Sequence, residues 1–334
     1  MGQSDISTLK FEGTDFSDIL PQFKEIQSKE EVLNVDRTLV LCDIMYDEEF
    51  KKLMGIFNTL LSLKEYSQRS INIVNAVIDN IPAYYTAWCF KLDIILALKK
   101  NLKEELLWLD EFTLENPKNY QIWSYRIELL QHYTKNKTET ECKELLKKEN
   151  VILSLMIEED SKNHHVWGYK SWLLNFLELD LEDLNMELTY SEFLIHQDLL
   201  NNSAWCFRHN ILMRLVTAAN NKADRVAIFK EELDYATEKI ALYPNNISSW
   251  NYYFRILEIL RKEDLAYFKE FIIDEASLLC EKHFNNSSYA IEYYCKLLVI
   301  VNGDKNKIKN MYILLRDHRD PIRKIYWDYK ISQL

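Results

Sequence analysis

Glycine and proline are scarce in this chain, at five residues each among 334. The lack of glycine disfavours glycine-rich phosphate loops, and the lack of both turn residues disfavours β-sandwiches with many short strands. A helical protein tolerates both shortages, because glycine and proline destabilise helix interiors. The composition therefore favours a largely helical fold.

Long apolar runs are absent as well. None approaches the roughly 20 residues that a membrane-spanning helix needs, and the opening MGQSDISTLK lacks the apolar core of a signal peptide. The six cysteines form no C-x-x-C pair, so neither a disulfide framework nor a cysteine zinc site is indicated. We expect a cytoplasmic protein without stable membrane insertion.

An excess of positive charge is the third absence. The formal net charge is -11 and the pI is near 5.3. Because nucleic-acid binding needs a basic surface, we expect no nucleic-acid partner. Apolar material is plentiful by contrast: 48% of the residues are hydrophobic, which is enough for a sizeable core.

Tryptophans recur along the chain at the intervals of a helical repeat. Successive anchor positions lie 35 to 45 residues apart, except that 77 residues separate the last two tryptophans. That gap equals two periods, and a tyrosine near its middle is expected to be the missing anchor. The seven anchors are Trp88, Trp123, Trp167, Trp205, Trp250, Tyr289 and Trp327.

The residues around the anchors repeat too. A proline six residues before the anchor stops one helix, and an asparagine four residues before it caps the next. We expect the anchor ring to pack in the core, and the cation three residues after it to bridge to a neighbouring hairpin. The prolines are Pro82, Pro117, Pro244 and Pro321; the asparagines are Asn119, Asn163, Asn201, Asn246 and Asn285; the cations are Lys91, Arg126, Lys170, Arg208 and Lys330.

Each unit is therefore predicted to be a helical hairpin. One hairpin cannot bury its apolar face alone, but stacked neighbours can. We predict an all-α superhelix, or solenoid, of about seven hairpins forming a crescent. It would occupy residues 46–334 as a single domain. Residues 1–45 show no clear period and are expected to be partly disordered or irregular.

The block P-x-N-x₃-W-x₂-R resembles the repeat of the protein prenyltransferase α subunit. The tetratricopeptide repeat has a similar period but places a glycine four residues after its tryptophan. Similarity to the α subunit of farnesyltransferase and type-I geranylgeranyltransferase extends over about residues 46–330. It rests on NPKNYQIWSYR (116–126), SKNHHVW (161–167), NNSAWCFRHN (201–210) and DPIRKIYW (320–327).

The resemblance implies an enzyme that is active only as an αβ heterodimer. Such an enzyme transfers a farnesyl or geranylgeranyl group from its diphosphate to the cysteine of a C-terminal Cys-a-a-X sequence, as in small GTPases. The β subunit holds the zinc ion and the isoprenoid pocket, and it selects the lipid. Magnesium would accompany the diphosphate if the enzyme needs it, a dependence that this sequence leaves open.

The resemblance also implies site residues in the turns that open two hairpins. Lys118 matches the lysine that stabilises the departing diphosphate, where a cation neutralises growing charge. Tyr120 matches a tyrosine lining the same mouth. Gln121 matches the glutamine that donates to the peptide's terminal carboxylate, and Tyr85 matches a tyrosine near the peptide. Without the resemblance, Lys118, Tyr120 and Gln121 would be surface-turn residues.

In the next hairpin, His165 matches a histidine near the peptide and the diphosphate. His164 stands where the family usually has a tyrosine that contacts the diphosphate, so its own role is open. An imidazole can still donate a hydrogen bond to phosphate. The two adjacent histidines lack the i, i+4 spacing of metal ligands on one helix face, and we expect no metal on this chain.

Two other functions fit a helical repeat. A non-enzymatic peptide-binding adaptor, similar to tetratricopeptide proteins, would need no β subunit and would give Lys118 no special role. A Rab-type prenyltransferase α subunit is the second alternative. Those chains can carry extra domains for which this chain has no room, although short forms exist.

Overall fold

The computed structural model describes residues 9–33, 45–135, 137–177 and 179–334, and helices dominate these residues. The prediction of an all-α helical-repeat fold is confirmed. The chain forms two compact units, Met1–Leu173 and Leu174–Leu334, so the division falls within helix α8. None of the described helices is both long and apolar enough to cross a membrane.

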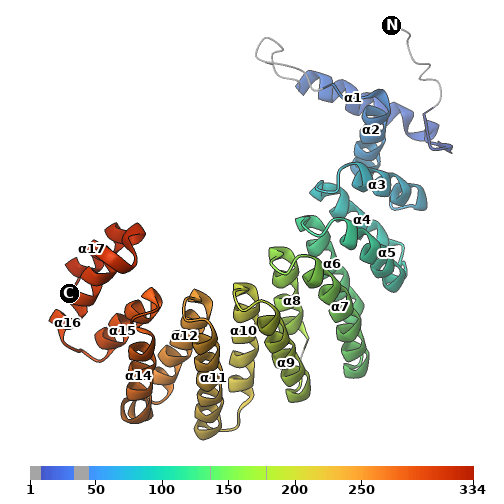
Figure 1. Ribbon diagram of the computed structural model, residues 1–334. Coiled ribbons are helices and arrows are strands. Elements are labelled where there is room, and N and C mark those ends of the chain that lie inside the picture. Colours follow the sequence, from blue (N-terminus) through green and yellow to red (C-terminus); the bar gives the residue numbers. More distant parts are fainter. Residues whose placement is uncertain (1–8, 34–44, 136, 178) are drawn as a thin grey trace. The chain divides into compact units, whose positions relative to one another are not determined.

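The first unit starts with a small hairpin and continues as a row of helices (Figure 1). Its elements are β1 Lys10–Phe11, β2 Thr14–Asp15, the 3-10 helix η1 Ser17–Ile19, α1 Leu20–Leu33, α2 Glu48–Leu63, α3 Gln68–Asn80, α4 Tyr85–Ala97, α5 Leu102–Glu115, α6 Tyr120–Thr134, α7 Glu139–Glu159 and α8 His164–Phe176.

The second unit continues the helical hairpins. Its elements are α9 Leu181–Gln197, α10 Asn202–Ala218, α11 Lys222–Leu242, α12 Ile247–Glu263, α13 Leu265–Tyr267, the π-helix η3 Phe268–Ile272, α14 Ile273–His283, α15 Ser288–Ile300, α16 Lys305–Leu314, the π-helix η4 Leu315–Arg319, the 3-10 helix η5 Pro321–Arg323 and α17 Lys324–Ser332.

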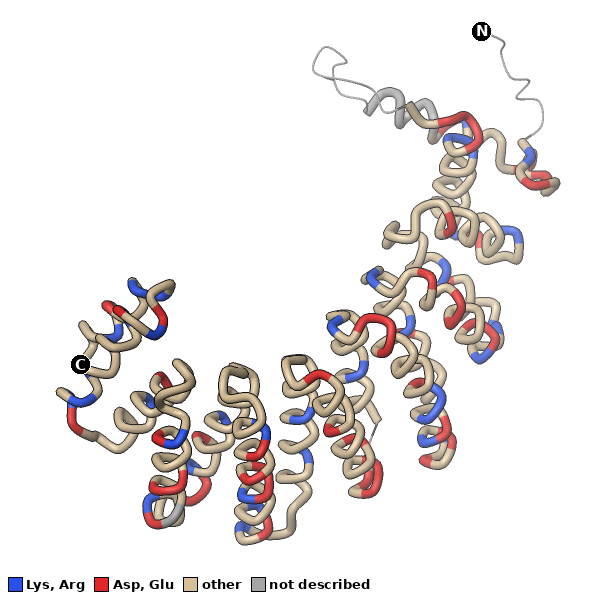
Figure 2. Tube along the Cα trace, viewed as in Figure 1, with Lys and Arg blue, Asp and Glu red and all other residues tan. Residues whose placement is uncertain are grey.

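Within each unit the helices form two layers. The tryptophan-bearing helices contact one another, α4 with α6 in the first unit and α10 with α12 in the second, and α12 also contacts α15. Figure 2 shows that Asp and Glu concentrate on the intervening helices α5, α7, α9 and α11. The negative charge of the chain therefore lies mainly on the layer that lacks the tryptophan anchors.

Asparagine caps begin four of the tryptophan-bearing helices, as predicted. The Oδ1 atom of each accepts from the backbone N–H two residues later, at 2.8 to 3.0 Å. These caps are Asn119, Asn163, Asn201 and Asn246. Each satisfies one of the N–H groups that a helix start leaves unpaired.

Two expectations for the repeat after Trp250 are wrong. Ser287, not Asn285, caps α15, and Tyr289 is only half-buried. Ile291 is fully buried and lies four residues after Ser287. The spacing from cap to anchor is therefore kept, but α15 begins two residues later than the asparagine predicts, and an aliphatic side chain takes the anchor position.

The predicted burial of the tryptophans is confirmed, since all six anchors are at most 7% exposed. Five of their indole N–H groups donate to the carbonyl oxygen six residues earlier, at 2.8 to 3.1 Å. A buried indole needs such an acceptor. The proline position thus also supplies a carbonyl oxygen, for example that of Pro117 to Trp123.

The same carbonyl groups tie neighbouring repeats together. Asn163 Nδ2 donates to the Pro117 oxygen at 3.2 Å, and Asn246 Nδ2 donates to the Leu199 oxygen at 2.7 Å. Each asparagine therefore caps its own helix with one side-chain atom and fastens the preceding repeat with the other. The sequence predicts only the first of these roles.

Buried ion pairs also join successive repeats. Arg126 donates to both Glu149 oxygens, at 2.8 and 2.7 Å, and Arg208 does the same to Glu232 at 2.9 and 2.7 Å. Lys91 pairs with Glu105 at 2.7 Å. These contacts confirm the predicted bridges for Lys91, Arg126 and Arg208, whereas Lys330 forms no ion pair with a residue that the structure describes and lies over Tyr326 of its own helix. The fourth cation on these helices, Lys170, donates to the side-chain oxygen of Asn150 on the preceding helix, at 2.8 Å.

A tyrosine hydroxyl completes each of the three ion pairs. Tyr125, Tyr169 and Tyr252 donate to the glutamates Glu105, Glu149 and Glu232, at 2.9, 2.6 and 2.5 Å. Each tyrosine lies two residues after an anchor tryptophan. Burial together with the adjacent carboxylate raises the pKa of all three phenols. Sequence reasoning missed this position, although its spacing from the tryptophan was a usable signal.

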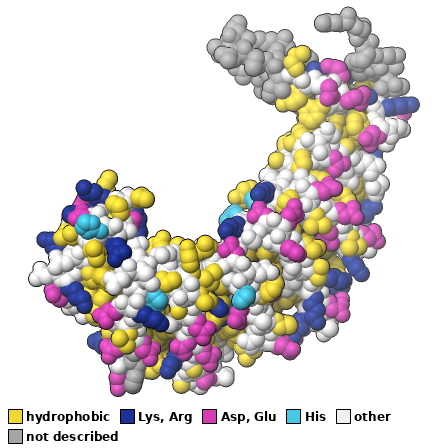
Figure 3. Space-filling view, viewed as in Figure 1, with side chains coloured by type: hydrophobic (Ala, Val, Ile, Leu, Met, Phe, Trp, Pro, Cys, Tyr) yellow, Lys and Arg dark blue, Asp and Glu magenta, His cyan; other side chains and the backbone are white. Residues whose placement is uncertain are grey.

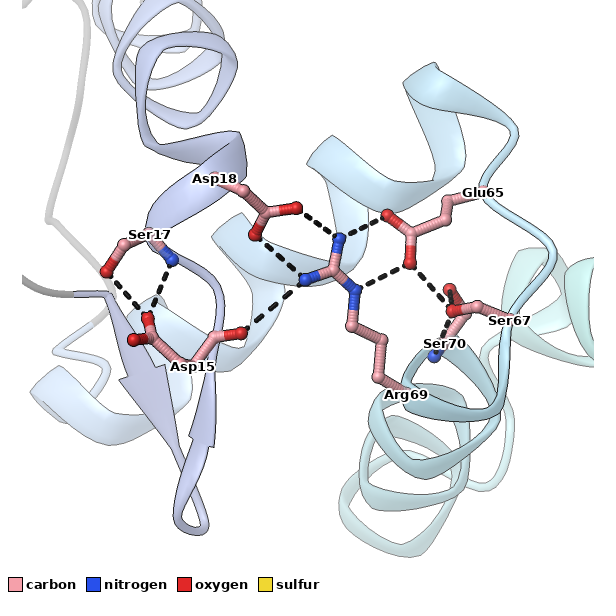
Figure 4. Close-up of polar contacts among 7 residues, drawn as sticks. All are labelled: Asp15, Ser17, Asp18, Glu65, Ser67, Arg69 and Ser70. Carbon is pink, nitrogen blue, oxygen red and sulfur yellow. Dashed lines mark hydrogen bonds and ion pairs between the residues drawn. The ribbon is translucent and has the colours of Figure 1, made fainter.

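The sequence predicts no regular element in the N-terminal segment, but the structure has a β-hairpin and the helix α1 there. Lys10 pairs with Asp15 and Phe11 with Thr14, and the turn has positive φ at Glu12 and at Gly13, where glycine relieves strain. The Arg69 guanidinium donates to the Asp15 carbonyl oxygen of this hairpin at 3.5 Å and binds both carboxylate oxygens of Asp18, in the following helix η1, at 2.8 Å (Figure 4). The expectation of disorder for residues 1–8 and 34–44 lies outside the described residues.

Arg69 also binds Glu65, at 2.6 and 2.7 Å, and its guanidinium lies 5.2 Å from the centre of the Phe16 ring. Hydrogen bonds from Arg69 hold the pKa values of Asp18 and Glu65 below their usual range. The hairpin and the loop between α2 and α3 are thus joined by one shared cation.

Candidate functional site

All six residues that the sequence singles out lie in the first unit, at turns that open the tryptophan-bearing helices. Tyr85 is the first residue of α4. Lys118 precedes the cap of α6, and Tyr120 and Gln121 begin that helix. His164 and His165 begin α8. The repeat therefore places them at equivalent ends of successive hairpins.

Lys118 is 73% exposed and spans two adjacent turns. Its Nζ atom lies 3.0 Å from Oδ2 of Asp160, which ends α7. The hydrogen bond from Lys118, helped by the Lys162 backbone N–H, lowers the pKa of Asp160. Sequence reasoning missed Asp160. Its signal was position: Asp160 and Asp198 each lie three residues before a cap asparagine and accept from the backbone two residues on.

Tyr120 and His165 form a contact between the same two turns. Their rings are 4.2 Å apart and nearly perpendicular, at 83°, and the His164 ring lies 5.8 Å from that of His165. Burial, then the nearby His164 and Lys118, lower the pKa of His165. The lowered pKa favours the neutral imidazole, which has one N–H to donate and one nitrogen to accept.

Gln121 and Tyr85 are placed differently. The backbone N–H of Gln121 donates to the Asn119 cap at 2.8 Å, and its side chain is half-buried. Tyr85 is 63% exposed and lies beside Cys89, whose thiol raises the pKa of the phenol. The structure therefore brings Lys118, Tyr120, His164 and His165 together, while the described contacts of Tyr85 lie outside this group.

The grouped side chains suit an oxygen-rich anion. They offer one ammonium group, one phenol and two imidazoles, and charge-assisted hydrogen bonds to phosphate or carboxylate are strong. Figure 3 shows histidine and cationic side chains side by side at the surface of this unit. Among the residues that the structure describes, no group of three or more His, Cys, Asp or Glu could hold a metal ion.

Fold and site together define a helical-hairpin repeat protein whose turns present a polar, cation-bearing surface. Comparison with known proteins identifies a family within this class of repeat proteins. The model of the protein prenyltransferase alpha subunit repeat matches residues 102–133, 146–177 and 229–260. The three matched segments pair α5 with α6, part of α7 with α8, and part of α11 with part of α12.

The chain belongs to the α-subunit family of protein farnesyltransferase/geranylgeranyltransferase type 1. It is 35% identical over 324 residues to the Candida albicans protein named "Protein farnesyltransferase/geranylgeranyltransferase type-1 subunit alpha", covering 96% of this chain and 97% of the relative. A solved structure described as Candida albicans protein geranylgeranyltransferase-I complexed with GGPP superposes with a TM-score of 0.73 and 33% identity, over 88% of this chain and 93% of the other.

The Rab-type alternative is not better supported. The "Geranylgeranyl transferase type-2 subunit alpha" of Saccharomyces cerevisiae is 24% identical, over 71% of this chain and 60% of its own length. The type-1 relative from Candida albicans is both more similar and more completely covered.

Proposed function

We propose that this chain is the α subunit of a heterodimeric protein prenyltransferase. With a β subunit, it would transfer a farnesyl or geranylgeranyl group to the cysteine of a C-terminal Cys-a-a-X sequence. The observation that carries the proposal is the grouping of Lys118, Tyr120 and His165 across two adjacent turns, with contacts of 3.0 and 4.2 Å. The family membership of the chain supports the same assignment.

The division of labour between the chains follows from what this chain offers. We assign the zinc ion to the β subunit, as the resemblance to the prenyltransferase α subunit implies. We also assign the choice between farnesyl and geranylgeranyl to that subunit, and we leave magnesium dependence to experiment. A cytoplasmic location and small GTPases as substrates remain part of the proposal.

In the reaction, a bond forms between the cysteine sulfur and C1 of the isoprenoid, and the bond between C1 and the diphosphate oxygen breaks. The diphosphate leaves with the electron pair, so negative charge grows on its oxygens. Lys118, bound to an exposed carboxylate in the free chain, can turn to this charge. Tyr120 and the neutral His165 would add hydrogen-bond donors, and preorganised donors of this kind stabilise the transition state.

We assign the substrate peptide to the neighbouring residues. The amide of Gln121 would donate to the terminal carboxylate of the Cys-a-a-X sequence, next to the diphosphate contacts of Tyr120. Tyr85 lies one repeat earlier and would contact the peptide farther from its end. His164, beside His165, would donate to the diphosphate in place of the tyrosine that the family usually has.

The test is prenyl transfer to a short Cys-a-a-X peptide from labelled farnesyl and geranylgeranyl diphosphates. The chain is assayed alone, with each candidate β subunit, and as Lys118→Ala in the heterodimer. We expect activity only in the heterodimer and a fall in kcat of about 100-fold in the variant, with the complex intact. Lys103→Ala, which removes an exposed lysine of α5, is the matched control and should keep full activity.

Two outcomes would contradict the proposal. If the chain associates with no β subunit yet binds peptides, the adaptor function replaces it. If the heterodimer prenylates proteins that lack a Cys-a-a-X end, the Rab-type function replaces it. Full activity of Lys118→Ala would remove only the role assigned to this lysine.

A further inference from the structure

One buried asparagine connects the two turns that carry the grouped side chains of the candidate site. Asn163 is 3% exposed and lies in the turn between α7 and α8. Its Oδ1 atom accepts from the backbone N–H of His165 at 2.9 Å, and its Nδ2 atom donates to the Pro117 carbonyl oxygen at 3.2 Å. Pro117 directly precedes Lys118 in the sequence. A single side chain therefore contacts both the residue before Lys118 and the backbone of His165.

The Pro117 carbonyl group determines where the Lys118 side chain starts. Because a peptide unit is planar, the carbonyl oxygen of Pro117 and the amide nitrogen and Cα of Lys118 move together. Two donors hold this oxygen: the Trp123 indole at 3.1 Å, from the same repeat, and Asn163 at 3.2 Å, from the next. The indole fastens the turn to its own helix, whereas the asparagine amide ties it to the helix that carries His165.

Lys118 depends on this backbone anchor because its side chain is largely exposed. Its ion pair is with Asp160, a carboxylate that is itself partly exposed, and a pair of this kind is weak. The region that the ammonium group can reach is therefore set by where the backbone of residues 117–118 is held. A shift of about 1 Å in a positioned group can cost on the order of 100-fold in rate.

The second unit contains the same two kinds of bond without the site residues. Asn246 is buried as well; its Oδ1 atom accepts from the Ser248 N–H at 3.0 Å, and its Nδ2 atom donates to the Leu199 carbonyl oxygen at 2.7 Å. The residue after that carbonyl group is Leu200, in place of a lysine. Asn163 and Asn246 therefore have equivalent roles in the fold, and a difference between them in catalysis measures positioning.

We propose that Asn163 is a positioning residue for the diphosphate site: by holding the Pro117 carbonyl group close to the start of α8, it keeps Lys118 within reach of the diphosphate that His165 also contacts. This inference rests on the proposed function, in which both residues stabilise the leaving diphosphate. Because Asn163 is buried in the turn, it acts on the reaction through Lys118 and not by contact with the substrates.

The test is steady-state kinetics of the heterodimer with a Cys-a-a-X peptide and the prenyl diphosphate that the wild type uses, for wild type, Asn163→Ala and Asn246→Ala. Asn163→Ala should lower kcat about tenfold and leave the KM of the prenyl diphosphate within about twofold, because Lys118 acts on charge that grows in the transition state. Asn246→Ala should keep kcat within about twofold of wild type. Unfolding curves of both variants should show similar losses of stability, since each loses a cap and one bond to the preceding repeat.

Two further variants separate the hydrogen bond from the fold. Asn163→Ser should restore kcat to within about threefold of wild type, because Ser287 makes both kinds of bond at the equivalent position of α15. The Ser287 hydroxyl accepts from the Ala290 N–H at 3.4 Å and donates to the Pro244 carbonyl oxygen at 2.5 Å. Asn163→Gly removes the donor, but glycine is tolerated as a cap. It should lower kcat as much as Asn163→Ala does, with a smaller loss of stability.

A double variant measures whether the effect passes through Lys118. In the Lys118→Ala background, Asn163→Ala should lower kcat by no more than about twofold, because the side chain that Asn163 positions is already gone. An undiminished tenfold loss in that background would overturn the positioning role. Equal losses of kcat in Asn163→Ala and Asn246→Ala would overturn it as well, since both asparagines would then act through stability alone.

Failure of this inference differs from failure of the proposed function. If the wild-type heterodimer transfers prenyl groups and Asn163→Ala keeps full kcat, the positioning role is wrong and the proposed function stands. If Lys118→Ala keeps full activity, the positioning role falls together with the role of the lysine. If the chain transfers no prenyl group with any β subunit, both the inference and the proposed function fall.

Discussion

Lys118 and Asp160 form a pair in which both side chains reach solvent, so water and salt weaken their attraction. An exposed pair of this kind contributes little to stability. It does set the charge that an incoming diphosphate meets, because the carboxylate offsets the ammonium group. The structure thus places a competitor for Lys118 within 3.0 Å of it.

Asp160→Asn should strengthen diphosphate binding. The amide keeps an oxygen for the Lys162 backbone N–H, but it removes the negative charge beside Lys118. We expect the inhibition constant of inorganic diphosphate for the heterodimer to fall about two- to fivefold, which is the scale of one exposed charge pair. An unchanged or higher constant would mean that Asp160 does not compete with the ligand for Lys118.

His164→Tyr introduces, at the first position of α8, the tyrosine that the resemblance implies there. Because phenol and imidazole can both donate to a phosphate oxygen, most activity should remain. Steady-state kinetics of the heterodimer check this, with His164→Ala as the comparison that removes the donor. A loss of more than tenfold in His164→Tyr would show that the two side chains are not equivalent.

The asparagines that cap the helix starts contribute unequally to stability, although they look alike in the sequence. Asn246 is 1% exposed, caps α12 and also donates to the Leu199 carbonyl of the preceding repeat. Asn101 caps α5 at the surface and makes its second contact with Glu104. Removal of the first cap therefore also removes one of the two donors to the Leu199 carbonyl, the other being the Trp205 indole, and removal of the second cap breaks no bond to another repeat.

Asn246→Ala should lower the free energy of unfolding by about 2–3 kcal/mol, and Asn101→Ala by about 1 kcal/mol. Urea unfolding followed by circular dichroism measures both. Equal losses would mean that the bond from Asn246 to Leu199 adds nothing beyond the cap.

Lys91, the buried cation of α4, makes the stability of the protein depend on pH, and the buried arginines of other repeats do not. The Nζ atom of Lys91 lies 3.0 Å from the centre of the Trp108 ring and 2.7 Å from Oε1 of Glu105. Burial of this side chain lowers the pKa of Lys91 to about 8. The unfolded lysine keeps a pKa near 10.4. Between pH 8 and about 10.4, the Lys91 side chain binds more protons in the unfolded chain than in the folded chain. The free energy of unfolding therefore rises as the pH increases between these two values.

Lys91→Arg should remove this rise, because arginine stays charged, as it does at the equivalent positions Arg126 and Arg208. Between pH 8 and 9.5 the wild-type free energy of unfolding should gain about 1.5 kcal/mol relative to the variant. Unfolding curves at each pH give the difference, and titrating tyrosines cancel between the two proteins. Parallel curves would assign the pH dependence to other groups.

At the scale of the whole molecule, stability should be local. Each hairpin of a repeat protein contacts chiefly its neighbours, so a core change acts most strongly near its own repeat. Trp250 is fully buried in the second unit and stacks on Tyr293 at 5.7 Å. Trp123 has the equivalent position in the first unit.

Trp250→Ala should cost about 3–5 kcal/mol and raise amide exchange mainly in the second unit, residues 174–334. Trp123→Ala should give the opposite pattern, and hydrogen exchange read by mass spectrometry compares them. A uniform loss of protection along the chain in both variants would indicate a single cooperative unit instead.

The sequence alone determined the repeat, the tryptophan core and most helix starts. These features depend on local spacing, because a cap, its helix and the apolar stripe of that helix lie within a few residues of one another. The resemblance carried by the same spacing then identified Lys118, Tyr120 and the adjacent histidines as candidates. Their side-by-side placement follows from the repeat itself.

Only the tertiary structure decided the contacts between repeats. Asp160 as the partner of Lys118, the tyrosines that complete the buried ion pairs, and the carbonyl groups that accept from cap amides of the next repeat all depend on how stacked helices meet. The shift from Tyr289 to Ile291 has the same origin, since the core selects whichever side chain faces it. Partners 14 to 47 residues apart leave no local spacing to read, and packing geometry alone brings them together.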